Sequence, residues 1–189
     1  SSGWEYYDHG MRIERVSIHK IWKDMEKLIK DGLVKNIGIC NFPVALINEL
    51  LSSCNILPSV LQVEVHPENS QSNLIKYCQN NGIRVAAFSP FGSTGYDTKD
   101  KSILNDPTIL YIAQKYECHP SQIVLSWIES KGCSVITKTD TKQHMSMNLK
   151  SIPLNILDLK KIDLLNKNHR YNNPSEFTQN WNGFEPIFD

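Results

Sequence analysis

The chain has 189 residues, of which 40% are hydrophobic and 21% charged, and its formal net charge at pH 7 is zero. This length suits one domain, and the composition is typical of a soluble globular protein. A neutral chain argues against a nucleic-acid partner, which would need a clustered basic surface. No apolar run approaches the roughly 20 residues of a membrane helix, and the first residues do not resemble a signal peptide.

Four short apolar segments alternate with helical patterns along the chain. The helical patterns cover 18–29, 43–51, a stretch around 74–78, two stretches that begin at Pro107 and Pro120, and then 142–150 and 156–166. Asp106 is the expected N-cap of the helix that begins at Pro107. The apolar segments at 37–40, 60–65, 84–88 and 133–137 are expected to be strands.

This alternation predicts a parallel sheet covered by helices. The pattern alone leaves two architectures open, a small doubly wound domain and part of a (β/α)8 barrel. A complete barrel takes about 250 residues. Four strands can therefore account for only half of one.

Five cysteines are present, an odd number with no CxxC pair among them. No two Cys or His residues stand at the spacing of zinc ligands. We therefore expect reduced thiols, a cytoplasmic location and no metal site.

Several segments beside the expected strands resemble the aldo-keto reductase family. The first segment, 25–42 (MEKLIKDGLVKNIGICNF), is similar to the signature at the family's fifth strand. Three further segments follow in chain order: 61–67 (LQVEVHP), 88–93 (FSPFGS) and 136–148 (ITKTDTKQHMSMN). The last two, 169–174 (HRYNNP) and 185–189 (EPIFD), are similar to the xylose reductase branch. Each segment alone is a weak signal, but together they appear in the family's order from about residue 16 to the end of the chain.

The resemblance implies a parallel (β/α)8 TIM barrel. This chain would supply about its C-terminal half, namely strands five to eight and their helices. Residues 1–15 would form the loop after the fourth strand. Residues 16–168 would run from the fourth helix to the C-terminal helix, and 169–189 would form a C-terminal substrate loop or tail.

Members of this family reduce aldehydes or ketones by hydride transfer from NADPH. We therefore expect an NAD(P)H-dependent reductase of the aldose or xylose type, with a small carbonyl substrate, that is a monomer or homodimer when intact. In the family a Tyr is the general acid, assisted by Lys, Asp and His on the first four strands. That tetrad would lie upstream, so this chain alone would be inactive. No residue of this chain is assigned a catalytic role. In particular, none is assigned to Tyr6, Tyr7, His9 or His19. The alternative is a non-catalytic binding or regulatory protein with the same fold.

By resemblance, Asn41 and Gln62 would hold the nicotinamide carboxamide, because an amide side chain both donates and accepts. Cys40 stands where the family usually has Ser. Phe88 would stack on the nicotinamide ring. The competing interpretations are a turn or helix cap for Asn41, a paired core amide for Gln62 and a core aromatic for Phe88.

The resemblance also assigns the phosphates. Ser89, Pro90, Phe91 and Ser93 would belong to the loop over the pyrophosphate, where small residues and backbone N–H groups suit phosphate oxygens. Without the resemblance this string indicates only a turn. Asn172 would contact sugar hydroxyls of the substrate.

The motif that starts at Ile136 would bind the adenosine end of the cofactor. Lys138 and Thr139 would contact the 2′-phosphate, and Asn148 the adenine. His144 replaces an Arg of the family; an imidazole is mostly neutral at pH 7 and lacks the guanidinium fork.

Asp140 would repel a phosphate dianion but could accept from a free 2′-hydroxyl. The sequence therefore predicts a weakened preference for NADPH, with NADH used as well. The alternative for Asp140 and His144 is a solvent-facing helix start.

Overall fold

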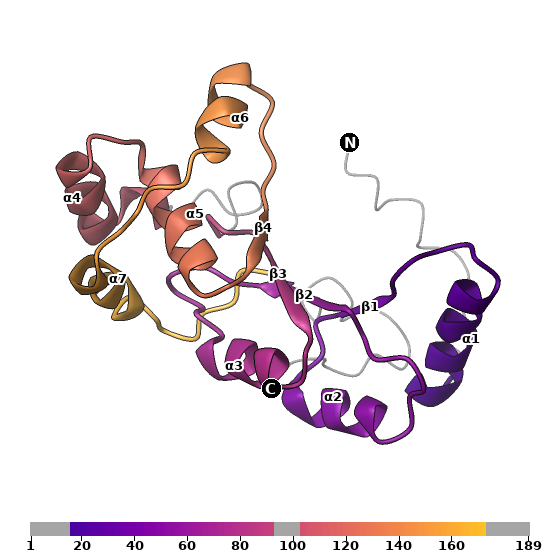
Figure 1. Cartoon of the computed structure of the whole chain (residues 1–189). Helices are drawn as coiled ribbons and strands as arrows, with labels where there is room; N and C mark the ends of the chain where they lie inside the picture. Colours follow the sequence, from indigo (N-terminus) through magenta and orange to yellow (C-terminus); the bar gives the residue numbers. More distant parts are fainter. Residues whose placement is uncertain (1–15, 93–102, 173–189) are drawn as a thin grey trace, which may run out of the picture.

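The computed structural model describes residues 16–92 and 103–172, which form a four-stranded sheet with helices packed on it (Figure 1). The strands are β1 (Gly38–Cys40), β2 (Val60–Glu64), β3 (Arg84–Phe88) and β4 (Ser134–Ile136). They pair in the order β1-β2-β3-β4, and every neighbouring pair is parallel.

This strand order decides between the two architectures that the sequence left open. A doubly wound sheet reverses its strand order and carries helices on both faces. Here each strand pairs with the next one along the chain, and the helices follow one side of the sheet, from α1 at the right through α2 and α3 to α5 at the left (Figure 1). The architecture fits the (β/α)8 fold.

The helices lie where the sequence predicts them. They are α1 (Ile18–Lys30), α2 (Val44–Leu51), α3 (Ser72–Asn80), α4 (Pro107–Lys115), α5 (Pro120–Ser130), α6 (Lys142–Asn148) and α7 (Ile156–Asp163), with a short 3-10 turn, η2 (Ile103–Asn105), that the sequence did not reveal. Asp106 is confirmed as the N-cap of α4, since its side chain accepts from Thr108 N at 2.8 Å.

Some predicted boundaries were wrong by one to three residues. The strands predicted at 37–40, 60–65 and 133–137 are each shorter, and Pro43 is the N-cap of α2 rather than its first residue. The helix predicted to reach 150 ends at Asn148 because the following chain bonds to α5, with Ile152 N donating to Ser126 Oγ at 2.7 Å. The helix predicted to reach 166 ends at Asp163, and Asn166 Oδ1 accepts instead from Ser70 N at 2.9 Å.

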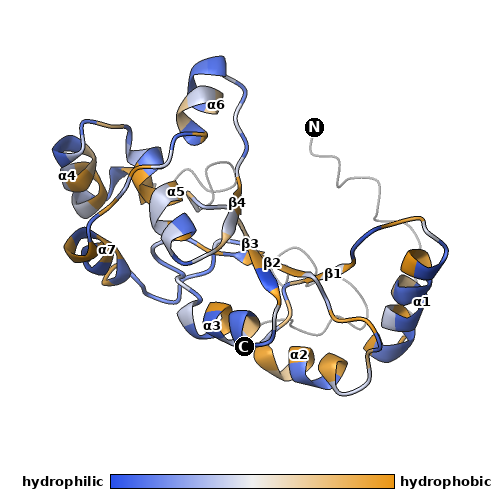
Figure 2. Cartoon of the chain, viewed as in Figure 1, coloured by the Kyte–Doolittle hydropathy of each residue, from blue (hydrophilic) through white to orange (hydrophobic). Residues whose placement is uncertain are grey.

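The two faces of the sheet have different environments. On the helix side, alternate strand residues are buried in the main core: Ile39, Leu61, Val63, Val85 and Ala87. The strands and α2 accordingly stand out as hydrophobic in Figure 2. The opposite face is partly open, because Cys40 is exposed, Gln62 and Phe88 are half-buried and Ile136 remains 48% exposed. This open face is the one on which most of the predicted nicotinamide contacts lie.

A buried carboxylate fixes the position of α1. Glu26 is 2% exposed. Its Oε1 accepts from the backbone N–H groups of Asn55 at 2.6 Å and Ile56 at 2.9 Å, and Trp22 Nε1 donates to Ile56 O at 2.9 Å. The hydrogen bond from Ile56 lowers the pKa of Glu26, burial opposes it, and the bonds from Asn55 complete a net shift below the ordinary value. Glu26 is therefore a charged anchor between α1 and the connection that leads to β2.

We expect Glu26→Gln to reduce the free energy of unfolding by about 1–3 kcal/mol at pH 7, because it weakens the pairing of two backbone donors. A carboxylate with a depressed pKa stabilises the fold above its unfolded pKa and loses that contribution as the pH falls through the folded pKa. The gap between wild type and variant in urea unfolding should therefore close below about pH 4. A gap that stays constant down to pH 3 would contradict this role for the charge.

Candidate functional site

The carboxyl ends of the four strands meet at one edge of the sheet. Cys40 is in register with Gln62, Glu64 with Phe88, and Phe88 with Ile136. Partners in parallel strands point to the same face, so these side chains share the partly open face. Barrel enzymes place their chemistry at this end of the strands.

Asn41, directly after β1, carries the clearest sign of a missing partner. Its backbone is left-handed, with φ of 58°, and its N–H donates to Gln62 O at 2.9 Å. Its side-chain Oδ1 is buried and has no hydrogen-bond partner within the described residues. The cap interpretation is wrong, because Pro43 caps α2 without a side-chain bond. A buried acceptor without a donor is costly, so this oxygen suits a ligand N–H group.

Gln62 and Phe88 occupy neighbouring strands beside Asn41. Both are half-buried and lie on the open face, not among the residues packed under the helices. Neither residue therefore belongs to the core under the helices. Their exposure leaves an amide and an aromatic ring available to a ligand, although their roles stay predictions.

Residues 89–92 form a tight turn at the end of β3, as expected. Ser89 and Gly92 both have positive φ, 49° and 73°, and Gly92 N donates to Ser89 O at 3.0 Å. Pro90 is buried and Phe91 is half-buried. Ser93 lies outside the described residues. Asn172 Nδ2 donates to Ser89 Oγ at 3.1 Å, so the predicted substrate residue lies against the predicted phosphate loop.

A buried cluster surrounds Glu64, which the sequence did not single out as a functional residue. Glu64 accepts from His66 Nε2 at 2.9 Å and from the backbone N–H groups of Tyr171 at 2.8 Å and Asn172 at 3.1 Å. Burial raises the pKa of Glu64, but the bonds from His66 and the two amides outweigh it and the net shift is downward. A carboxylate in an apolar strand must be paired, and this was the available signal.

The motif after β4 is more exposed. Lys138, Asp140 and His144 are exposed, and Thr139 is half-buried. His144 N donates to Thr141 Oγ1 at 3.3 Å, which caps α6. This arrangement is the solvent-facing helix start of the alternative interpretation. It also leaves the three charged or ionisable side chains accessible to a ligand.

Two groups at the start of α5 border this exposed motif. The ring centroids of His119 and His144 are 5.9 Å apart, and Asn148 Oδ1 accepts from Ser121 Oγ at 3.5 Å. Burial, followed by the proximity of His144, lowers the pKa of His119. His119 is therefore held in its neutral form at pH 7, which adds no positive charge to this end of the site.

Of the four residues that were given no catalytic role, the structure describes one, His19. Tyr6, Tyr7 and His9 lie outside the described residues. His19 bridges α1 to α2, with Nε2 at 3.2 Å from Glu49 Oε1 and Nδ1 at 2.6 Å from Ser53 Oγ. This pairing is that of a surface helix residue, as expected.

Residues 16–92 and 103–172 contain neither a cluster of metal ligands nor a helix that could span a membrane. No group of three or more His, Cys, Asp or Glu side chains there could hold a metal ion. No helix in the same ranges has the length and apolar character to cross a membrane.

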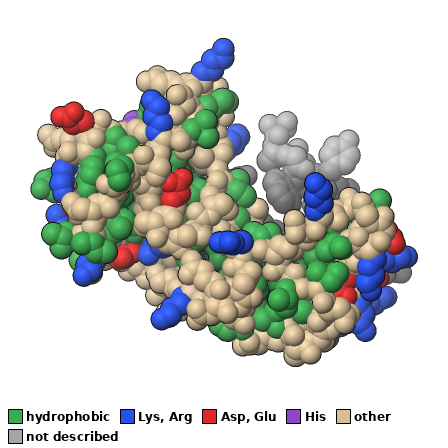
Figure 3. All heavy atoms as spheres, viewed as in Figure 1, with side chains coloured by type: hydrophobic (Ala, Val, Ile, Leu, Met, Phe, Trp, Pro, Cys, Tyr) green, Lys and Arg blue, Asp and Glu red, His purple; other side chains and the backbone are tan. Residues whose placement is uncertain are grey.

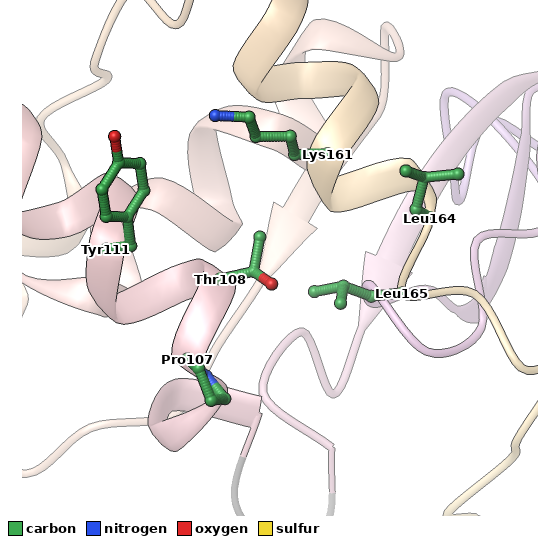
Figure 4. Close-up of a pocket in the computed structure, with 6 residues that line it drawn as sticks. All are labelled: Pro107, Thr108, Tyr111, Lys161, Leu164 and Leu165. Carbon is green, nitrogen blue, oxygen red and sulfur yellow. The ribbon is translucent and has the colours of Figure 1, made fainter.

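A separate hollow of about 410 Å³ lies between α4 and α7 (Figure 4). Its lining residues are Pro107, Thr108, Tyr111, Lys161, Leu164 and Leu165. Hydrophobic side chains also gather over this end of the molecule in Figure 3, and Leu157 and Leu164 are strongly exposed. None of the predicted cofactor residues that the structure describes lines this hollow, so it is not part of the candidate site.

Comparisons with known proteins agree with this geometry. A model of the aldo/keto reductase family matches residues 4–167. The chain is 41% identical over 158 residues to an aldose reductase of Encephalitozoon cuniculi, covering 83% of this chain and 52% of that protein. It is 38% identical over 177 residues to an NAD(P)H-dependent D-xylose reductase of Kluyveromyces lactis, covering 88% and 54%.

A solved structure is also similar. It is a Bombyx mori aldo-keto reductase in complex with NADP, with a TM-score of 0.80 and 33% identity over 87% of this chain and 55% of that one. The chain thus spans about half the length of the relatives it matches.

Gly92 allows a prediction with an internal control. A Cβ at Gly92 would lie 2.7 Å from the ring of Tyr171, whereas Gly82, with the same φ of 73°, has nothing within 4 Å. Gly82→Ala therefore measures backbone strain alone, about 1 kcal/mol. We expect Gly92→Ala to cost about 1–3 kcal/mol more in urea unfolding, because the ring must move. Equal losses in the two variants would show that Tyr171 does not pack over Gly92.

Proposed function

Because this chain belongs to the aldo/keto reductase family, we propose that it is the cofactor-holding part of an enzyme that reduces aldehydes and ketones with NADPH. The names of the similar proteins support this function: one is an aldose reductase and another an NAD(P)H-dependent D-xylose reductase. Neither name supports the non-catalytic alternative.

One observation carries the proposal, the buried and unpartnered Oδ1 of Asn41 within the described residues. A nicotinamide carboxamide has an N–H2 group that can donate to this oxygen and a carbonyl that can accept from an amide such as Gln62. Phe88, in the same open face, offers a ring for stacking. Together these residues would orient the nicotinamide so that one of its faces points to the substrate.

When bound, NADPH supplies the hydride that reduces the carbonyl carbon. The residues of this chain would bind the cofactor and the substrate and orient them. The turn at 89–92 would face the pyrophosphate, and Asn172 would accept or donate at a substrate hydroxyl. We place the general acid and its Lys, Asp and His partners outside this chain. The greater length of the relatives, of which this chain covers about half, leaves room for them.

The adenosine end would discriminate weakly between the two dinucleotides. Lys138 and Thr139 favour a 2′-phosphate, while Asp140 repels it and His144 lacks the fork of an Arg. All of these except Thr139 are exposed, so their electrostatic contributions are modest and screened by salt. We propose NADPH as the main cofactor, NADH as a second one, and a sugar-like or other small carbonyl substrate. The five free thiols suit a cytoplasmic location.

The nicotinamide contact is tested with Asn41→Ala in the full-length protein. The loss of one uncharged hydrogen bond is worth about 1 kcal/mol, or roughly fivefold in affinity. We expect the dissociation constants of NADPH and NADH to rise by this same factor in fluorescence titrations, and carbonyl-dependent oxidation of NADPH to slow. Asn36→Ala, an exposed amide bonded to Ser59, is the matched control. Equal effects of the two variants, or wild-type protein that binds neither dinucleotide, would contradict the proposed function.

The adenosine contact is tested with His144→Arg. A guanidinium fork on a phosphate is worth about 1.5–3 kcal/mol. NADPH should therefore bind at least tenfold more tightly to the variant at moderate salt, with NADH unchanged. Lys142→Arg, a nearby conservative change, should alter neither. Wild-type protein that already binds NADPH a hundredfold more tightly than NADH would refute the weakened preference.

A further inference from the structure

Glu64 has a position that the binding roles above do not explain. We propose that Glu64 is a positioning residue: it fastens the C-terminal segment, residues 167–172, onto the turn at 89–92, so that the two become ordered together. The order of the two segments does not depend on the proposed function. Only the link from these ordered segments to the binding of cofactor and substrate rests on the proposed function.

The Glu64 carboxylate holds backbone as well as side chains. It is fully buried. Oε1 accepts from His66 Nε2 at 2.9 Å and Tyr171 N at 2.8 Å, while Oε2 accepts from Asn172 N at 3.1 Å and lies 3.8 Å from Arg170 Nη1. Two consecutive amides on one carboxylate fix the path of the chain at that point, and bonds to an ionised acceptor are the stronger kind.

This path directs two side chains to the turn. The Tyr171 ring lies so close to Gly92 that a Cβ there would be 2.7 Å away. Asn172 Nδ2 donates to Ser89 Oγ at 3.1 Å. His66 and His169 flank the same ring, with centroids at 5.2 Å and 4.5 Å from that of Tyr171. The contacts of Tyr171 and Asn172 with the turn are therefore made by residues whose amides Glu64 holds.

Glu64 is also joined to the root of the turn. It pairs in register with Phe88, the residue before Ser89, and Val65 N donates to Phe88 O at 3.3 Å. The end of β2, the turn and the C-terminal segment thus form a closed ring of contacts. Loosening one link should loosen the other two.

A second anchor holds the start of the segment independently of Glu64. The backbone oxygen of Glu68 accepts from Lys167 N and His169 N, both at 3.0 Å. The Glu68 carboxylate pairs with Lys167 Nζ at 2.7 Å and Tyr171 Oη at 2.6 Å. Loss of the Glu64 bonds should therefore expose the amides of residues 171 and 172 to exchange and leave those of 167 and 169 protected, a pattern that general destabilisation would not produce.

If the turn faces the pyrophosphate and Asn172 the substrate, the ring of contacts links the two ligands. Cofactor that orders the turn would also order the substrate residue, and the coupling must act equally in both directions. Each ligand would thus favour the binding of the other.

Amide hydrogen exchange without cofactor tests the coupling in Glu64→Gln. We expect exchange at Tyr171, Asn172 and Gly92 to accelerate at least tenfold, while Lys167 and His169 keep their protection. Glu26→Gln is the matched control, because it also weakens a buried carboxylate that holds two consecutive amides. It should affect Asn55 and Ile56 and leave the three amides near the turn unchanged. Unchanged exchange at Tyr171 and Asn172, or at Gly92 alone, would overturn the proposal.

Asn172→Ala removes a different link of the same ring of contacts, the bond to Ser89, and leaves the buried Glu64 carboxylate intact. It should accelerate exchange at Gly92 even if Glu64→Gln fails to fold, and an unchanged Gly92 would count against the coupling. With saturating NADPH, the full-length wild type should gain protection at 89–92 and at 171–172, and Glu64→Gln only at 89–92. Absence of any NADPH effect in the wild type would refute the proposed function, whereas the exchange pattern without NADPH decides the role of Glu64.

Discussion

The parallel register of β2 with its neighbours is the constraint on which the candidate site depends. It places Gln62 beside Cys40 and Ala86, and Glu64 beside Phe88. A slip of one residue would turn each of these side chains to the helix face. The approach of β1 also depends on Gly38, since a Cβ there would lie 2.5 Å from Val60 Cγ1 and 2.7 Å from Val60 O. A residue without a side chain is thus needed for Asn41 to reach its place beside Gln62.

Buried carboxylates join segments of the fold that lie far apart in the sequence. Glu26 holds the connection at Asn55 and Ile56, Glu64 holds Tyr171 and Asn172, and Asp158 accepts from Lys115 Nζ at 2.6 Å and Tyr116 Oη at 3.0 Å. The bond from Lys115 lowers the pKa of Asp158 against the effect of burial. Each carboxylate is ionised and paired at neutral pH, which is the condition under which a buried charge is tolerated. Acid should therefore loosen the attachments of the sheet before it disrupts the apolar core.

The sequence predicted what depends on local pattern. The alternation of apolar segments located the four strands, and Asp106 followed by Pro107 located the start of α4, because capping chemistry acts within a few residues. The choice between a barrel-type and a doubly wound sheet needed the strand order, which periodicity does not contain. Two partners of Glu64, the amides of Tyr171 and Asn172, are 107 and 108 positions away, so no local pattern could reveal them. The ends of α6 and α7 likewise depend on distant bonds to Ser126 and Ser70.

The two ends of the candidate site are built in different ways, and this difference bears on where the sequence can vary. At the proposed nicotinamide end, Asn41 and the Glu64 cluster are fixed by backbone geometry and burial, and a shift there would disturb the sheet itself. At the proposed adenosine end, Lys138, Asp140 and His144 are exposed side chains after a short strand, and each can be exchanged with little cost to packing. The replacement of the family's Arg by His144 lies at this tolerant end. Preorganised groups would thus keep the nicotinamide ring oriented for hydride transfer. The preference between NADPH and NADH would instead change through substitutions of the exposed side chains after β4.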